Sequence, residues 1–338
     1  MSEAASILRR RTLIILGAAA AVSALLGAGS FMPPAQDMPR TEVGQLVLPA
    51  FESKVGLVSL VMVTTDEESY HLVKNPDGWV MPEKGNYPVS PARIQELTQA
   101  LSDMTYARAM TRDEKKFDHI GLGDPAKGGT GALLEVGDGS GTSFAKLLVG
   151  HREGRSYIRK PDDLQAWVVD RAVLPPLQRA VRWLDLDVAP LKSGDIAAVD
   201  VRPAQGPSYR LIANAEGGFG LAQPYTTRHV VTPLAPGMAA EALTRFSPID
   251  VAPVQQVAAG RPVADYMVRT KAGVVIVVRS WKREDRGWVT ISAATGEGAP
   301  PEAVNQAAAI NAKAAPWAFA LTELDWNGFS TPLSELVD

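Results

Sequence analysis

A long apolar run lies close to the start of the chain. From Thr12 to Met32 the sequence carries no charge and is rich in Leu, Ile and Ala. Because a helix rises about 1.5 Å per residue, this run spans about 30 Å, the thickness of the hydrocarbon core of a bilayer. The pattern predicts a transmembrane helix over residues 12–32, preceded by a short cytoplasmic segment, residues 1–11.

The charges around this run predict its orientation. Arg9, Arg10 and Arg11 stand directly before it, and no Lys or Arg follows within a few residues. The positive-inside rule then puts the N-terminus in the cytoplasm and the remainder of this single-pass inner-membrane protein in the periplasm. A cleaved secretory signal is the alternative, with Gly27 and Gly29 as small residues of a cleavage site, although the apolar stretch is long for a signal.

The next residues predict a linker and then a folded unit. Residues 33–48 contain three prolines among scattered charges, which is typical of an extended linker. Residues 49–190 then show apolar and polar positions that alternate between turns rich in Gly and Asp. The expected strands of this first unit lie at residues 55–63, 70–74, 79–80, 132–136, 143–149, 155–160 and 166–170.

One helix of the first unit has a clear start and a clear apolar face. Ser90 supplies an N-cap hydroxyl, and Pro91 stands at the first helical position. Apolar residues then recur at intervals of three and four, namely Ile94, Leu97, Leu101 and Met104. We expect this face to pack on the sheet. A short polar helix near residues 112–117 and a helix over residues 175–184 complete the unit.

The second half of the chain, residues 191–338, repeats this order. Ser69-Tyr70 resembles Ser208-Tyr209, and Trp167 corresponds to Trp317. Matching strands are expected at residues 266–270, 274–281 and 287–292, and the matching helix carries Ala239, Leu243 and Phe246. The sequence offset grows from about 138 to about 150 residues, as loops of varying length would produce. The chain is therefore predicted to be α+β, with an N-terminal transmembrane helix followed by two tandem similar units, 49–190 and 191–338, of antiparallel sheet with packed helices.

These turn and strand markers resemble a known family. The markers are Gly78-Trp79, Tyr87-Pro88, Gly121-Leu122 with Pro125, Val149-Gly150 and Tyr157-Ile158-Arg159. Their order is similar to that of an uncharacterised bacterial domain-of-unknown-function family of single-anchor envelope proteins, over about residues 50–330. Its genes often lie beside those of ABC-type exporters and gliding-motility auxiliary proteins. The resemblance implies an accessory role at the membrane and implies no catalytic residue.

Composition narrows the chemistry that the chain can perform. It contains no cysteine, which excludes disulfides, thiolate metal sites, a cysteine nucleophile and a lipid-modified cysteine anchor. The net charge of -3 in 338 residues gives no strong field to recruit nucleic acid. Apolar residues make up 46%, as in ordinary globular proteins. We therefore expect a folded body with neither nucleic acid as a partner nor a metal as a cofactor.

Four patterns that suggest chemistry have simpler explanations. The histidines at 71, 119, 151 and 229 show no pair at ligand spacing. Ser143 and Lys146 match Ser-x-x-Lys, but in a strand they point to opposite faces. Lys127 precedes its neighbouring glycines, so the spacing of a phosphate loop fails. The paired acids at 66–68 and 162–163 fall at predicted turns, where solvated acids are common.

We therefore assign no catalytic, cofactor-binding or metal-binding residue and expect a protein that is not an enzyme. The favoured function is an accessory or scaffold subunit of an ABC-type transport complex, held in the membrane by its N-terminal helix, with transporter subunits or other envelope proteins as partners. A periplasmic binding module for glycan, lipid or peptide is one alternative, which a deep apolar groove between the units would favour. A hydrolase with an unrecognised site is the other, which two acids and a histidine in one pocket would favour.

Overall fold

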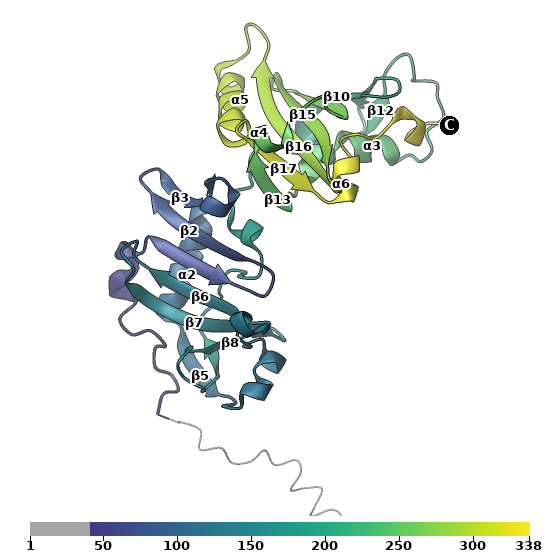
Figure 1. Ribbon diagram of the computed structural model, residues 1–338. Helices are drawn as coiled ribbons and strands as arrows, with labels where there is room; N and C mark the ends of the chain where they lie inside the picture. The colour runs from purple at the N-terminus through teal and green to yellow at the C-terminus, as the bar shows by residue number, and fades with distance from the viewer. Residues whose placement is uncertain (1–40) are drawn as a thin grey trace, which may run out of the picture.

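The computed structural model describes residues 41–338, which form two antiparallel sheets, one after the other along the chain (Figure 1). The predicted α+β class with two antiparallel sheets is confirmed. Within residues 41–338, no helix is both long and apolar enough to cross a bilayer. The predicted cytoplasmic segment, the predicted membrane helix over residues 12–32 and the first half of the predicted linker lie outside the described residues.

The first sheet has nine strands in the order β4-β3-β2-β1-β6-β7-β8-β9-β5. Its strands are β1 (Leu60–Thr64), β2 (Ser69–Asn75), β3 (Gly78–Met81), β4 (Tyr87–Pro88), β5 (Thr105–Ala109), β6 (Ala132–Gly137), β7 (Ser143–Arg152), β8 (Arg155–Arg159) and β9 (Trp167–Asp170). One α-helix, α2 (Pro91–Asp103), accompanies them. The 3-10 helices of this half are η1 (Glu52–Leu57), η2 (Pro82–Lys84), η3 (Glu114–Lys116), η4 (Asp118–Ile120), η5 (Pro125–Lys127) and η6 (Ala180–Trp183).

The second sheet has eight strands in the order β12-β11-β10-β14-β15-β16-β17-β13. Its strands are β10 (Ile196–Pro203), β11 (Tyr209–Ala213), β12 (Phe219–Leu221), β13 (Asp250–Pro253), β14 (Ala264–Thr270), β15 (Val274–Arg283), β16 (Arg286–Thr295) and β17 (Trp317–Leu321). The helices of this half are α3 (Ala235–Ala240), α4 (Val254–Val257), α5 (Pro301–Ala314), α6 (Glu323–Asn327), η7 (Ser193–Asp195), η8 (Ala242–Arg245) and η9 (Leu333–Glu335).

The two sheets share one strand order. Without the two-residue β4, the first sheet reads β3-β2-β1-β6-β7-β8-β9-β5, and each position has a counterpart in the second sheet from β12 to β13. In both halves, the strand after the helix (β5 or β13) pairs at the far edge with the last strand (β9 or β17). Because both sheets share this strand order and this edge pairing, the two halves are similar units. We call residues 41–190 the first unit and residues 191–338 the second.

In each unit, a tyrosine hydroxyl forms a hydrogen bond to the C-terminal segment of that unit. The Tyr70 hydroxyl donates to the Leu177 carbonyl at 2.8 Å, and the Tyr209 hydroxyl donates to the Thr331 carbonyl at 2.8 Å. Isolated bridges then pair Val89 with Leu184 in the first unit and Val230 with Val337 in the second. The predicted match between Tyr70 and Tyr209 therefore reflects one structural role. It ties the C-terminal segment of each unit across its sheet.

The expected apolar face of α2 is buried. Ile94, Leu97, Leu101 and Met104 are each at most 8% exposed. In the second unit Leu243 is buried and Phe246 is half-buried, although α3 has only six residues. A 3-10 helix, η8, carries Leu243 instead of a continued α-helix.

Several predicted elements differ from the structure. The segment at residues 175–184 holds only η6, because Ala180 and Trp183 bond to Glu68 and Tyr70, at the start of β2. The first strand begins at Leu60, since residues 52–57 form η1. Strand β5 and helix α5 were not predicted. For α5 the signal was present: Pro301 stands at its start, and Ala303, Ala307, Ile310 and Ala314 form its buried face.

An ion-pair triad crosses three strands of the second sheet. The Asp200 carboxylate accepts from Arg210 Nε at 2.6 Å and from Arg269 Nε at 2.9 Å, so β10 is tied to both of its neighbours, β11 and β14. Asp200 is only 6% exposed. Burial alone would raise the pKa of this carboxyl, but the hydrogen bonds from Arg210 and Arg269 outweigh it and hold the pKa below its usual range.

Replacing Asp200 by Asn is expected to destabilise the protein by about 1–2 kcal/mol at pH 7, because hydrogen bonds to a charged partner are lost. The folded-state pKa of Asp200 lies below its unfolded value of about 3.9, so the stabilisation is complete above that value and is lost as pH falls through the folded-state pKa. Urea denaturation between pH 7 and pH 3 should show the two proteins converging at acid pH. Asp77→Asn at the exposed β2–β3 turn is the matched control, and a pH-independent difference for Asp200→Asn would contradict the prediction.

Candidate functional site

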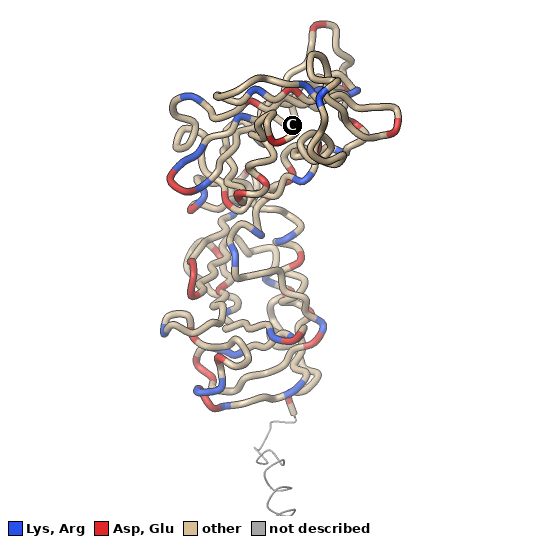
Figure 2. Tube along the Cα trace, turned by 90° about the vertical axis from the view of Figure 1, so that its right-hand side faces the viewer, with Lys and Arg blue, Asp and Glu red and all other residues tan. Residues whose placement is uncertain are grey.

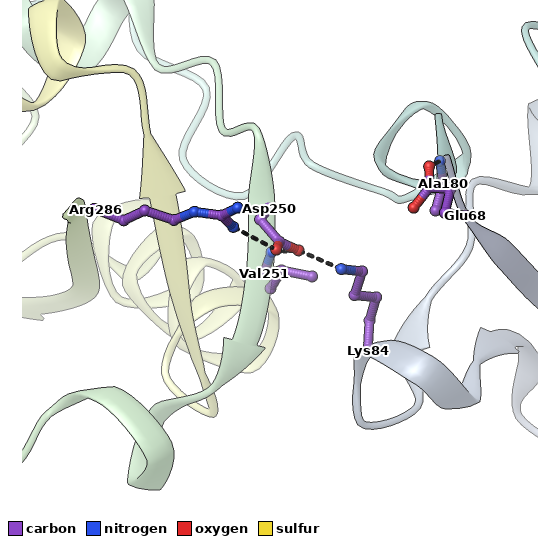
Figure 3. A network of polar contacts seen from close by, with 6 residues as sticks. All are labelled: Glu68, Lys84, Ala180, Asp250, Val251 and Arg286. Carbon is purple, nitrogen blue, oxygen red and sulfur yellow. Dashed lines mark hydrogen bonds and ion pairs between the residues drawn. The ribbon is translucent and has the colours of Figure 1, made fainter. Parts of the chain in front are cut away.

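The two units meet where η2 and β4 of the first unit face β13 of the second. Figure 3 shows Lys84 reaching across to Asp250, with Nζ 2.6 Å from Oδ1. Arg286 approaches the other carboxylate oxygen of Asp250 from within the second unit, with Nη1 at 3.4 Å. Asp250 Oδ1 also accepts from the Val251 amide at 2.8 Å. One carboxylate thus joins cations of both units.

Aromatic packing surrounds this ion pair. The ring of Tyr87 in β4 meets Trp317 edge-on, with centroids 4.8 Å apart, and Phe319 at 6.2 Å. Beside it, Gly85 adopts a φ of 69°, and a Cβ there would lie 2.7 Å from Cγ of Pro253. Tyr87 is 1% exposed. The junction is therefore a packed contact that continues the core of each unit.

A second polar contact holds the junction at the segment after β9. Lys313 in α5 donates to the Asp185 carboxylate and to the Asp187 carbonyl, both at 3.1 Å. The Tyr87 hydroxyl donates to the Asp185 carbonyl at 2.9 Å. Burial, with a smaller contribution from the Asp185 charge, raises the pKa of the Tyr87 phenol, which therefore stays neutral. This tyrosine serves as a structural anchor and offers no phenolate for chemistry.

A charged pocket of about 220 Å³ opens at this junction. Its lining residues are Glu67, Glu68, Lys84, Arg179, Val181, Ile249, Asp250 and Arg286. Glu68 Oε1 accepts from the Ala180 amide at 2.5 Å, so this acid caps η6. The lining contains no serine, threonine or histidine. Asp250 pairs with Lys84 and Arg286, and the pocket is small and polar, unlike the deep apolar groove that a binding module between the units would require.

The structure places the four histidines apart. His71 Nδ1 pairs with the Glu83 carboxylate. Burial opposes ionisation of Glu83, but the hydrogen bonds from the His71 ring and backbone outweigh it and lower the pKa of this carboxyl. His119, His151 and His229 are exposed. Across residues 41–338, no three His, Asp or Glu side chains lie close enough together to hold a metal ion.

The other sequence patterns also stay apart. Lys146 in β7 pairs with Glu135 of β6 at 2.9 Å, while the Ser143 hydroxyl donates to the Ala145 carbonyl at 3.4 Å. The Ser-x-x-Lys pair is therefore not assembled. The acids at 66–68 and 162–163 lie at turns, as expected, and Glu68 caps η6.

The glycine-rich loop after η5 is filled by backbone. A Cβ at Gly129 would lie 2.3 Å from the Gly123 carbonyl carbon, and one at Gly131 would lie 2.5 Å from the Gly123 oxygen. Beside this loop, the Arg159 guanidinium stacks on Phe117 at 4.7 Å. Its Nη1 donates to three backbone carbonyls, at Lys160, Pro161 and Asp163. Gly129 and Gly131 thus allow two chain segments to touch.

A larger and more apolar groove, of about 500 Å³, lies on the second unit. Helices α3 and α6, with η8 and η9, contribute its lining: Thr232, Ala235, Met238, Ala239, Ala242, Arg245, Leu324, Asp325, Asn327, Gly328, Thr331, Glu335 and Leu336. Large apolar side chains stand exposed at its edge: Leu324 is 80% exposed and Met238 is 59% exposed. Such a surface is typical of a binding site. Sequence reasoning missed it because α3 and α6 are far apart in the chain.

Residues 79–251 match a family model described as a domain of unknown function, DUF4340. This span covers just over half of the 338 residues of the chain. The chain belongs to the DUF4340 family. The matched range begins in β3 and ends in β13, so the DUF4340 match includes parts of both sheets and the junction residues Lys84, Tyr87 and Asp250. No curated protein and no solved structure matches the chain.

Replacing Tyr87 by Ala is expected to loosen the junction of this DUF4340 protein. Loss of a fully buried aromatic ring costs about 3–5 kcal/mol, and the vacated space faces Trp317 and Phe319. Amide hydrogen exchange should therefore accelerate in β13 and β17 of the second unit as well as in β4. Tyr106→Ala is the matched control, because Tyr106 packs on Trp167 within the first sheet. Equal acceleration of β13 and β17 in both variants would contradict this role.

Proposed function

We propose that the protein is a membrane-anchored, non-enzymatic accessory or scaffold subunit of an ABC-type transport complex in the bacterial envelope. The anchor is the apolar segment at residues 12–32, and both sheet units lie in the periplasm. The first unit acts as a spacer, and the second unit presents a surface to the partner. The link to transport rests on the family that the sequence resembles, and the spacer role rests on the fold.

The observation that carries the proposal is the head-to-tail order of the two sheets. Residues 44–47 enter beside β5, where the Gly44 amide donates to the Tyr106 carbonyl at 2.7 Å and the Val47 amide to the Met104 carbonyl at 2.9 Å. The second unit contacts the opposite edge, at β4 (Figure 1). The sheet has nine strands from β5 to β4, so eight spacings of about 4.8 Å separate the two edges by about 38 Å along the sheet. This width supports a unit that holds its neighbour away from the membrane.

The charge distribution is consistent with a scaffold. Acidic and basic residues are interspersed over both units (Figure 2). Many of them form cross-strand or junction pairs, such as Lys146 with Glu135 and Lys84 with Asp250. A surface of mixed sign offers little steering toward nucleic acid or an anionic lipid surface. Partner choice then depends on local shape and apolar contact.

The groove on the second unit favours a peptide-binding module as the second candidate function. Its volume of about 500 Å³ lies in the range of ligand sites, and most of its lining is apolar or small. The two candidates are compatible, because an accessory subunit also needs a surface that captures its partner.

The topology of the chain tests the anchor. A reporter fused after Asp338 is expected to be active only outside the cytoplasm, and the protein should stay in the membrane after carbonate washing. Replacing Arg9, Arg10 and Arg11 by Glu should weaken or invert insertion, because these charges set the orientation. Recovery of a soluble form that starts near residue 30 would show a cleaved signal instead.

Crosslinking in native membranes tests the accessory role. We expect ABC-type transporter subunits to be enriched with the full chain over a control that carries residues 1–48 alone, since the folded units provide the contact surface. The His71→Ala variant should enrich them equally, because this histidine has only a structural partner, Glu83. Equal recovery with the anchor-only control, or loss of a function in folded His71→Ala, would contradict a non-enzymatic scaffold.

A further inference from the structure

The groove on the second unit has apolar walls and a floor of small residues. Ala235, Ala239 and Ala242 come from α3 and the start of η8, and Gly328 follows α6. The rim carries Leu324 at the opposite wall, which is 80% exposed. Two helical walls over a floor of alanine and glycine allow another backbone to approach closely and receive large side chains.

In the first unit, the position that corresponds to Leu336 of the groove carries a larger side chain. The terminal bridges pair Val89 with Leu184 and Val230 with Val337, so the residue before each bridge corresponds: Trp183 in the first unit and Leu336 in the second. Trp183 is fully buried, and its Nε1 donates to the Tyr70 hydroxyl at 2.8 Å. In the second unit the smaller Leu336 lines the groove. The groove is therefore a departure from the packing of the first unit.

The corresponding helices, α2 and α3, also differ in size, and the second unit again has the smaller one. In the first unit α2 has 13 residues and buries Leu97 and Leu101. In the second unit α3 has six residues, and its buried residues are Pro236, Ala239 and Ala240. A shorter helix with smaller side chains covers less of the sheet. Both differences place smaller side chains, such as Ala239 and Leu336, in the lining of the groove.

The charged residues at the rim of the groove determine whether it favours a basic or an acidic ligand. Glu335 is exposed and has no polar partner for its carboxylate among the described residues, and Asp325 accepts from the Thr322 hydroxyl at 2.7 Å. The one cation of the lining, Arg245, is engaged by the Met238 carbonyl at 2.7 Å and by Glu241 at 3.7 Å. The lining therefore carries a net negative charge, with Asp325 and Glu335 against Arg245. It favours basic side chains and repels an anionic lipid surface.

We propose that this groove binds an amphipathic helix of a partner protein, with the apolar face of that helix between α3 and α6 and its basic residues beside Glu335 and Asp325. This inference rests on the proposed accessory function, for which it supplies the contact surface. The partner helix places in the second unit the apolar bulk that Trp183 supplies in the first.

The test uses a defined probe: a fluorescent Leu–Lys peptide of about 14 residues, patterned as an amphipathic helix. Its binding to the full chain in phosphatidylcholine nanodiscs is measured by anisotropy, with empty nanodiscs as the blank. We expect saturable binding that is at least about tenfold tighter than that of a Leu–Glu peptide of the same pattern, and that weakens with added salt. Tighter binding of the Leu–Glu peptide, or of phosphatidylglycerol vesicles, would overturn the proposal.

Variants locate the binding. Leu324→Gln should weaken it at least about fivefold, because an exposed apolar anchor is lost without change to the core. Glu335→Gln should weaken it about threefold and reduce its salt dependence. The matched control is Val304→Gln in α5, an exposed apolar residue remote from the groove lining, which should leave affinity unchanged.

Leu336→Trp adds a test from inside the groove. It introduces the side chain that the first unit uses, and a folded variant should lose binding because the groove is filled. The exposed variants at Leu324 and Glu335 decide the outcome if Leu336→Trp fails to fold. Equal affinities for Leu324→Gln, Glu335→Gln and Val304→Gln would place the peptide elsewhere and refute the site. Peptide binding requires no transporter, so its failure is distinguishable from failure of the crosslinking experiment.

Discussion

The packing of Tyr87 against Trp317 determines where each surface of the second unit lies. A sheet edge exposes unpaired backbone groups, and proteins cover such edges. Here β4 ends the first sheet, and side chains of the second unit cover it. Most of the buried apolar residues of both units form one connected cluster. The junction is therefore an extension of the core. The groove consequently keeps a defined position relative to residue 41.

The two units show which features of the repeat are structural. Both keep the strand order, the tyrosine that bonds the returning segment and the terminal bridge. They differ in the elements that cover the sheets. The second unit adds α5, where Asn311 bonds both the amide and the carbonyl of Ala293 in β16. It also shortens the helix that matches α2. Packing alone does not require the two units to differ. The surfaces on which they differ are therefore candidates for function.

Several charged groups in this protein hold strands or units together. Asp200 joins three strands, and Asp250 joins the two units. Such pairs are partly exposed and contribute modest stability each, but they fix register and relative position. The candidate chemical groups, by contrast, lie on separate surfaces. This fold therefore offers a partner shape and apolar contact. It presents them at a distance from residues 44–47, where the chain enters the first unit.

The sequence alone determined the periodic parts of the fold. The α2 stripe, most strands of both sheets and the duplication follow from local spacing, because each apolar face must be buried. The family resemblance also followed from turn markers. Local patterns failed where long-range contacts decide the conformation. Residues 175–184 form only the short helix η6 because Leu177, Ala180 and Trp183 bond to Glu68 and Tyr70, more than 100 positions away in the chain.

Only the tertiary structure decided which surfaces come together. The junction joins Lys84 and Asp250 across 166 positions of the chain, and the groove joins α3 to α6 and η9. Local spacing in the sequence does not predict these two contacts, because they depend on how strands from both halves of each unit cross. The same holds for the chemistry: Ser143 and Lys146 are close in sequence, yet Lys146 pairs with Glu135 and the Ser143 hydroxyl donates to the Ala145 carbonyl.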